Sequence, residues 1–195
     1  MNIFALSIDP YLAAKWQCDK HIVKMPLESA QMKSTIFREI NGVLGDVKSK
    51  NVLGDIKITK RFILPEFGEK DGMWDTEKCP IYWGVHSKHP CTLWCRESKS
   101  NWEWHKWHAL YLCDEYKFRY GKTHASKQII DLIISNSIDL PNKCLTRFAL
   151  AMPEEYKTKS AVKSYRAYYQ MEKSKFAKWS KRKPPYWWEE VNNHE

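Results

Sequence analysis

Apolar positions recur at helical spacing along most of this chain, and the pattern predicts an all-α fold. Asp9 and Pro10 provide an N-cap and a proline at the first helical position, which is how many helices begin. Apolar residues over 11–40 then cluster on one side of a helix. Pro26 lies inside this segment and predicts a kink or a break into two helices, and Gly42 ends it.

Three further segments show the same period. The first is a long predicted helix over 89–120 that opens at a His-Pro pair and closes at Gly121. The others are a short apolar helix over 126–135 and a last helix over 159–179. At 195 residues, these helices predict one compact single domain spanning residues 1–195.

Two stretches lack helical periodicity. The 42–88 stretch is rich in Gly, Pro, Lys and Asp, so we expect a long, mostly irregular basic excursion. A basic flap and an ordinary solvated loop both fit it. In the aromatic C-terminal tail, residues 181–195, two consecutive prolines precede residues 186–188. We expect these three residues to be non-helical and either to pack back on the body or to contact a ligand.

The charge balance favours a polyanionic partner. Thirty-two Lys and Arg against 23 Asp and Glu give a net charge of +9 and a pI near 9.2. Ten Trp and ten Tyr add rings that can stack on bases as well as pack in a core. No membrane-spanning run and no secretory signal is evident, and the six cysteines lack a compact disulfide spacing. We therefore expect an intracellular, cytoplasmic protein with reduced thiols, no membrane association and a monomeric state.

Positive charge alternates with aromatic rings in the last quarter of the chain. Binding of backbone phosphates together with base stacking requires this mixture. The nucleic-acid contacts predicted there are Arg166, Lys178, Lys181, Arg182, Lys183 and Trp187.

The most informative chemistry lies near the N-terminus. His21 and Glu28 are seven residues apart, which places them on one helix face, two turns apart. Lys20 and Lys24 flank them. Buried imidazole and carboxylate groups are costly unless they are paired or functional. The plain alternative is that both groups bond to backbone or to each other.

Two other sets of residues suggest different chemistry. Cys91 and Cys95, with His105 and His108, are ligand types that zinc accepts. One long helix cannot gather them, because Cys95 and His105 would lie about 15 Å apart along it. Cys18 lies one turn before His21, which could activate a thiol nucleophile. Packed cysteines and helix-surface histidines explain the first set more simply, and Cys18 fits the role of a small apolar residue in a helix. We expect no metal and no other cofactor.

The N-terminal third resembles the small phage-type pyrimidine-dimer DNA glycosylases, the endonuclease V group of ultraviolet-repair enzymes. The family's Asp-x-His and its Glu seven residues beyond the His match Asp19, His21 and Glu28. The stretch 89–121 is similar to the family's middle helix with its glycine-bearing end. Residues 182–188, Arg-Lys-Pro-Pro-Tyr-Trp-Trp, are similar to its C-terminal tail.

The resemblance implies a compact all-α glycosylase with coupled AP-lyase activity on double-stranded DNA. In that family the N-terminal amine attacks the anomeric carbon of the sugar and forms a Schiff base. An α-amine suits this role, because its pKa near 8 leaves part of it unprotonated at neutral pH. Glu28 would be the acid/base, His21 the positioning residue, and a flipped damaged or modified pyrimidine the target. The resemblance also implies a DNA-associated protein of the kind that viruses encode.

The chain departs from the family pattern at two places. The family exposes a small second residue by removing its initiator Met, whereas Asn2 follows Met1 here, so the amine would belong to Met1. The family's arginines beside its Glu are absent, and Lys20, Lys24 and Lys33 could bind DNA phosphates instead. Three alternatives stay open: a DNA base-modifying transferase, a non-catalytic nucleic-acid-binding protein and a zinc-stabilised structural protein.

Overall fold

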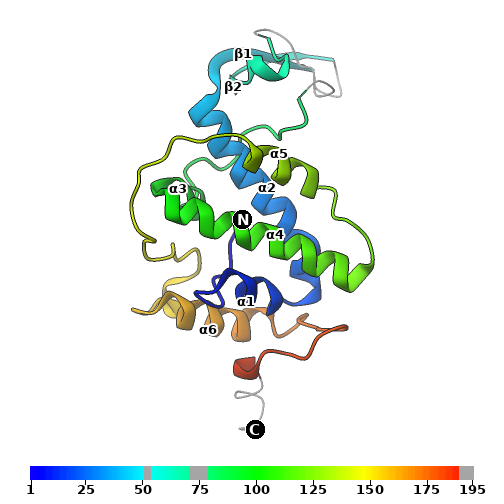
Figure 1. Ribbon diagram of the computed structural model, residues 1–195, viewed down its shortest axis with the longest axis vertical. Helices are drawn as coiled ribbons and strands as arrows, with labels where there is room; N and C mark the ends of the chain where they lie inside the picture. Colours follow the sequence, from blue (N-terminus) through cyan, green and yellow to red (C-terminus); the bar gives the residue numbers. More distant parts are fainter. Residues whose placement is uncertain (51–53, 71–78, 189–195) are drawn as a thin grey trace.

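The computed structural model describes residues 1–50, 54–70 and 79–188, and shows a helical body with a β-hairpin at one end (Figure 1). The α-helices are α1 (Pro10–Lys15), α2 (Asp19–Asn41), α3 (Pro90–Glu97), α4 (Lys99–Tyr120), α5 (Lys127–Ser135) and α6 (Ala161–Lys173). Two 3₁₀ turns, η1 (Pro65–Phe67) and η2 (Glu154–Tyr156), lie in the connections.

The hairpin corrects the all-α prediction. Strands β1 (Val43–Lys50) and β2 (Ile56–Ile63) pair antiparallel inside the 42–88 stretch that was expected to be mostly irregular. The cause is local: Ile56 and Ile58 alternate with polar residues at the two-residue period of a strand, and β-branched residues favour extended backbone. The fold is therefore mostly helical, with one small two-stranded sheet.

Both long predicted helices are divided, but not at Pro26. Helix α2 continues through Pro26, whereas an extended Cys18 separates α1 from α2. The Cys18 N–H bonds to the Tyr169 hydroxyl at 2.8 Å, so a contact from the other end of the chain supports this break. Ser98, also extended, separates α3 from α4 and caps α4 through its side chain, which accepts a hydrogen bond from the Asn101 N–H.

Several helix ends agree with the sequence prediction. Asp9 caps α1 through its side chain, and Gly121 ends α4 in the left-handed conformation at φ 68°. Helix α6 is shorter than the predicted 159–179. The expectation that residues 186–188 are non-helical is wrong: they form a helical turn in which the Trp188 N–H bonds to the Pro185 carbonyl. Proline is compatible with a helix start.

The core lies where α2 and α4 cross, with α1, α3 and α5 packed around them (Figure 1). The N-terminal lead threads into this core, where the side chains of Ile3, Ala5 and Leu6 are fully buried. This burial fixes the first two residues beside α2. No helix in the described part of the chain is long and apolar enough to cross a membrane.

Candidate active site

A pocket of about 240 Å³ opens where the N-terminal lead meets α2 and α6. The lead and α2 contribute most of its wall, and Ala151, Tyr168 and Lys173 close the far side. The predicted catalytic residues Met1, Asn2, His21 and Glu28 all line this one pocket, as does Lys24.

Glu28 is the acceptor at the centre of the pocket. Its Oε2 accepts a hydrogen bond from the Asn2 N–H at 2.8 Å and lies 3.8 Å from the amino nitrogen of Met1. Its Oε1 lies 3.0 Å from Nζ of Lys24, one turn earlier on α2. The carboxylate is buried, with only 7% of the residue exposed. A carboxylate and an α-amine therefore face each other across the pocket floor.

The side chain of Met1 is more buried than its main chain. The Met1 side chain is only 3% exposed and its sulfur lies 3.8 Å from Oγ1 of Thr92, whereas the residue as a whole is half-buried. The exposed portion of Met1 is therefore its main chain, which carries the amine. The buried thioether anchors the first residue at the pocket.

Asn2 sets the direction of the lead. Its side-chain amide donates to the Ala151 carbonyl at 2.9 Å, and its Oδ1 accepts from the N–H groups of Ile3 and Phe4. Phe4 has a positive φ of 42°, an uncommon conformation for a bulky residue. Strain of this kind concentrates at functional sites, where the surrounding contacts hold it.

His21 is held rigidly and is neutral near pH 7. Its ring stacks on Phe4 at a centroid distance of 4.5 Å, and its Nδ1 lies 2.7 Å from the Tyr169 hydroxyl. The pKa of His21 is lowered to about 3, mainly by burial and then by the charges of Lys173, Lys24 and Lys20. A neutral, wedged imidazole suits positioning better than proton exchange near pH 7.

The predicted DNA-contacting residues divide into exposed and enclosed groups. The exposed ones are Lys20, Lys24, Lys178, Lys181 and Lys183. Arg182 is half-buried and binds Glu115 at 2.6 Å, and Arg166 donates to the Leu6 carbonyl and lies over the Trp16 ring. Both arginines are thus already engaged within the protein.

Two of the predicted contacts are corrected by their burial. Lys33 is fully buried because its position on α2 faces α4, where its Nζ lies 3.6 Å from the centre of the Trp102 ring. Trp187 is only 3% exposed because the tail packs back on α1 and α6, against Trp16 and Tyr169. Neither side chain can contact DNA in this structure.

The Cys and His residues that were weighed as zinc ligands are not gathered into a metal site among the described residues. In the described part of the chain, no three His, Cys, Asp or Glu residues are arranged to hold a metal ion. Cys91, Cys95, His105 and His108 are all buried in the core instead. Cys18 is also fully buried, and it does not line the pocket.

Sequence reasoning missed the parts of the site that come from distant segments. Ala151 lies in an irregular connection, and nothing in the local pattern marks it. His89 is close enough to the site that its pKa is lowered mainly by burial and then by the Met1 amine. Lys173 and Tyr168 lay within the basic aromatic stretch, but their placement in this pocket had no local signal.

The comparisons with known proteins give no further assignment: no family model, no curated protein and no solved structure matches the chain.

Proposed function

We propose that this protein binds double-stranded DNA and acts as a glycosylase with AP-lyase activity, excising a damaged or modified pyrimidine from a flipped nucleotide. The observation that carries the proposal is the 3.8 Å separation between the Met1 amine and Glu28 inside one pocket. The volume, about 240 Å³, is below the roughly 300–1,000 Å³ of pockets for drug-sized ligands, so it suits part of one nucleotide.

The chemistry follows from the neighbouring groups. The unprotonated amine forms a bond to the anomeric carbon while the bond from that carbon to the base breaks, and the departing base takes the electron pair. Glu28 accepts the proton that the amine loses and stabilises the positive charge that develops on the sugar. Opening of the sugar ring gives the Schiff base from which the strand is cleaved. Lys24 and Lys173 surround the site with positive charge that favours the DNA backbone.

The retained methionine is compatible with this chemistry. If Met1 stays in place, its amine lies 3.8 Å from Glu28; the Asn2 nitrogen, which removal of Met1 would expose, lies 2.8 Å away. In either case an α-amine is beside the carboxylate. Mass spectrometry of the N-terminal peptide identifies which amine is free.

Borohydride trapping tests the proposal. Wild-type protein incubated with ultraviolet-irradiated duplex, or with duplex containing one abasic site, should give a covalent adduct after reduction. Glu28→Gln should lower adduct formation by at least about 100-fold, since acid–base groups typically contribute 10²–10⁴-fold. Extension of the chain by residues placed before Met1 should abolish it, because the amine would move out of the pocket.

The matched control is Glu172→Gln, because Glu172 is exposed on α6 and bonds only to the Tyr156 hydroxyl among the contacts described. This variant should trap like the wild type. No wild-type adduct on either substrate would overturn the lyase proposal. Salt-dependent DNA binding that survives Glu28→Gln would then favour a binding protein, and a modified base in nucleoside mass spectra would favour a transferase.

A further inference from the structure

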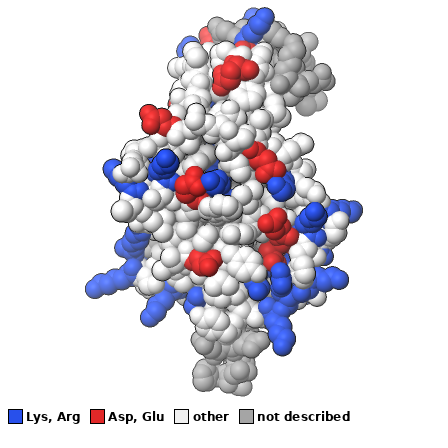
Figure 2. Space-filling view, in the orientation of Figure 1, with Lys and Arg blue, Asp and Glu red and all other residues white. Residues whose placement is uncertain are grey.

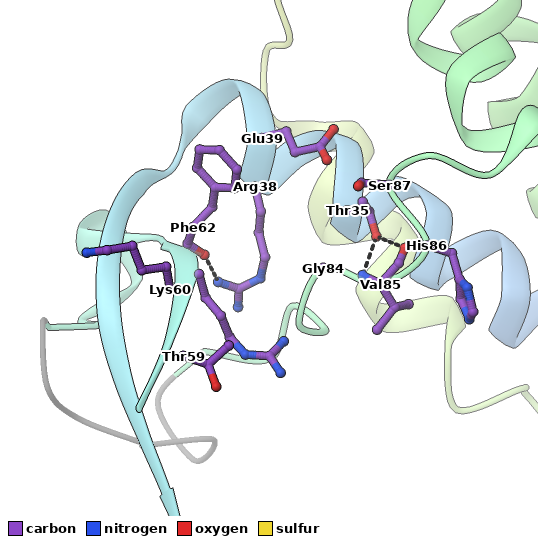
Figure 3. A pocket seen from close by; sticks show the side chains of 11 residues that line it. Thr35, Arg38, Glu39, Thr59, Lys60, Phe62, Gly84, Val85, His86 and Ser87 are labelled. Atoms are coloured by element: carbon purple, nitrogen blue, oxygen red, sulfur yellow. Dashed lines mark hydrogen bonds between the residues drawn. The ribbon is translucent and has the colours of Figure 1, made fainter. Parts of the chain in front are cut away.

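A second pocket of about 270 Å³ lies at the base of the hairpin, between β2, the C-terminal half of α2 and segment 84–87 (Figure 3). We call it the hairpin pocket. The polar residues that line it include Thr59, Arg61, His86 and Ser87. The candidate active site shares none of these residues.

The walls of the hairpin pocket are fixed by hydrogen bonds. Oγ1 of Thr35 lies 2.9 Å from both the nitrogen and the oxygen of Val85, which holds segment 84–87 against α2 (Figure 3). Arg38 donates to the Phe62 carbonyl at 2.9 Å and so ties β2 to α2. The charge of Arg38 is matched by Glu69, which it binds through two contacts of 2.7 Å.

Arg61 differs from the other cations of this pocket because the described residues give it no ion pair. Its guanidinium lies over the Trp83 ring, and its buried Nε has no hydrogen-bond acceptor. Lys60 binds Asp46 at 3.1 Å and points away from the cavity (Figure 3). Across the hairpin, the partner of Arg61 is Gly45, which has no side chain to fill the space.

Among the described residues that line the hairpin pocket, the one carboxylate is already paired. Glu39 forms an ion pair with Arg96 on α3. A buried N–H without an acceptor is unfavourable, and more so when it belongs to a charged group. The planar fork of an arginine matches a phosphate, and hydroxyls are common additional phosphate contacts. The chemistry that fits Arg61, Thr59 and Ser87 is thus an oxyanion with several acceptors.

Segment 84–89 joins the hairpin pocket to the candidate active site. His86 lines the first, and His89 lies near the second, where burial, the Met1 amine and His86 lower its pKa while Glu28 raises it. Phe4 and His86 are the two non-glycine residues with positive φ in the described part of the chain, and each lines one of the two pockets.

The spacing of the hairpin pocket and the candidate active site along α2 suits a nucleic-acid strand. Glu28 and Thr35 are seven residues apart on α2, which is about 10 Å along the helix axis. One strand of B-DNA advances about 3.4 Å per nucleotide, so about 10 Å corresponds to three nucleotides.

We propose that the hairpin pocket binds one backbone phosphate of the DNA strand, about three nucleotides from the nucleotide that enters the active site, with Arg61 as the main donor. This inference rests on the proposed function for its choice of partner. It assigns the hairpin a role in holding the strand in register, separate from the chemistry at Glu28.

The first experiment measures affinity for an abasic-site duplex over a series of salt concentrations, in a Glu28→Gln background that prevents turnover. Adding Arg61→Gln should weaken binding roughly tenfold at low salt and reduce the slope of log affinity against log salt by about 0.9. Arg61→Lys should keep the slope while losing part of the affinity, because it keeps the charge without the fork. Arg147→Gln is the control, since its guanidinium bonds to the Thr158 carbonyl and does not line either DNA-facing pocket.

The second experiment uses neutral methylphosphonate linkages, placed one at a time along the strand, and measures binding with and without Arg61→Gln. One position about three nucleotides from the abasic site should weaken binding, and Arg61→Gln should remove the effect of that position alone. Unchanged affinity and slope in Arg61→Gln, or no position that depends on Arg61, would overturn the inference. Stabilisation by inorganic phosphate alone, without a position effect on DNA, would indicate a free-anion site and would also overturn it.

The two proposals can fail separately. A trapped adduct with the wild-type protein, together with no effect of Arg61→Gln, would support the lyase proposal and overturn the phosphate site. A position-dependent effect of Arg61→Gln, together with no trapped adduct, would support the phosphate site and overturn the lyase proposal.

Discussion

Lys33 lies in the middle of the core with its amino group near the Trp102 ring and without a hydrogen-bond partner. Its pKa is lowered to about 7: burial is the main cause, Cys95 and Glu103 act in the opposite direction, and Lys106 adds a smaller lowering. The protein therefore carries a poorly solvated amine between α2 and α4. The position favours an uncharged side chain, whereas binding a phosphate requires a charged, accessible amine.

Replacing Lys33 by Met should stabilise the protein most at and below neutral pH. The folded pKa is below the unfolded value near 10.4, so the unfolded state binds more protons between pH 7 and 10, and wild-type stability rises with pH in that window. The gain from Lys33→Met at pH 7 should be on the order of 4 kcal/mol and should shrink towards pH 10.

Thermal or urea unfolding of the wild type and of Lys33→Met between pH 7 and 10 measures the difference in their free energies of unfolding. The titration of the cysteines and tyrosines is common to both proteins and cancels in this difference. Lys122→Met, at an exposed position, is the control and should change little. A stability gain that does not depend on pH would contradict the lowered pKa.

At the scale of elements, the hairpin depends on a close approach at its root. Gly42 ends α2 in an extended conformation that any residue can adopt, but a Cβ there would lie 2.5 Å from the Arg38 carbonyl oxygen and 2.8 Å from that of Ile63. Glycine is therefore needed for space rather than for its backbone angles. The same close approach brings Arg38 within reach of β2.

Gly42→Ala should destabilise the protein by about 1–3 kcal/mol, since backbone has to move to admit the methyl group. Gly84→Ala is a matched comparison: its nearest neighbours are atoms of Thr35 at 3.8 and 3.9 Å, and its φ is not positive. That variant should be neutral or slightly stabilising. Chemical denaturation measures both, and equal losses in the two variants would contradict the packing explanation.

At the scale of the whole molecule, one polar network joins the start of α2, the end of α4 and the C-terminal segment. Arg119 binds Asp19 at 3.0 Å and Glu115 at 3.1 Å, and Glu115 also binds Arg182. The second oxygen of Asp19 accepts from the N–H and the hydroxyl of Ser180. Asp19, which matches the Asp of the family motif, is the first residue of α2, and it ties the helix that carries His21 and Glu28 to α4 and to the C-terminal segment.

Asp19→Asn should cost about 1 kcal/mol at neutral pH, a value reduced for its partial exposure. Burial raises the pKa of Asp19, but the hydrogen bonds from Ser180 and Arg119 outweigh it and the pKa is lowered. The contribution is therefore complete above about pH 5 and is lost as the pH falls through the folded pKa, below 3.8. Unfolding curves should thus show Asp19→Asn to be less stable than the wild type at pH 7 and equally stable in acid. Asp114→Asn, at an exposed site, should match the wild type at both pH values.

On the face shown in Figure 2, the charged side chains are also unevenly spread. Figure 2 shows clusters of Lys and Arg side chains on both flanks of the half that contains α1 and α6, while acidic side chains are scattered over the middle and the hairpin end. Long-range attraction to a polyanion would act on this basic half first, whatever residues make the final contacts.

The sequence by itself determined most of the helices and the shared face of His21 and Glu28. These features depend on local rules: apolar spacing, the Asp9 cap and the left-handed Gly121 act within a few residues of themselves. The hairpin also had a local signal in the alternation at Ile56 and Ile58, but the surrounding Gly, Lys and Asp residues led to the prediction of an irregular stretch.

Only the tertiary structure decided where the amine of Met1 lies and which lysines face water. The amine reaches Glu28 because Asn2 bonds to the carbonyl of Ala151, 149 residues away, and because the lead is buried in the core. Lys33 and Lys24 have the same chemistry and lie on the same helix, yet one is enclosed by α4 and the other borders the pocket. Such differences arise from packing between distant segments, which local spacing does not encode.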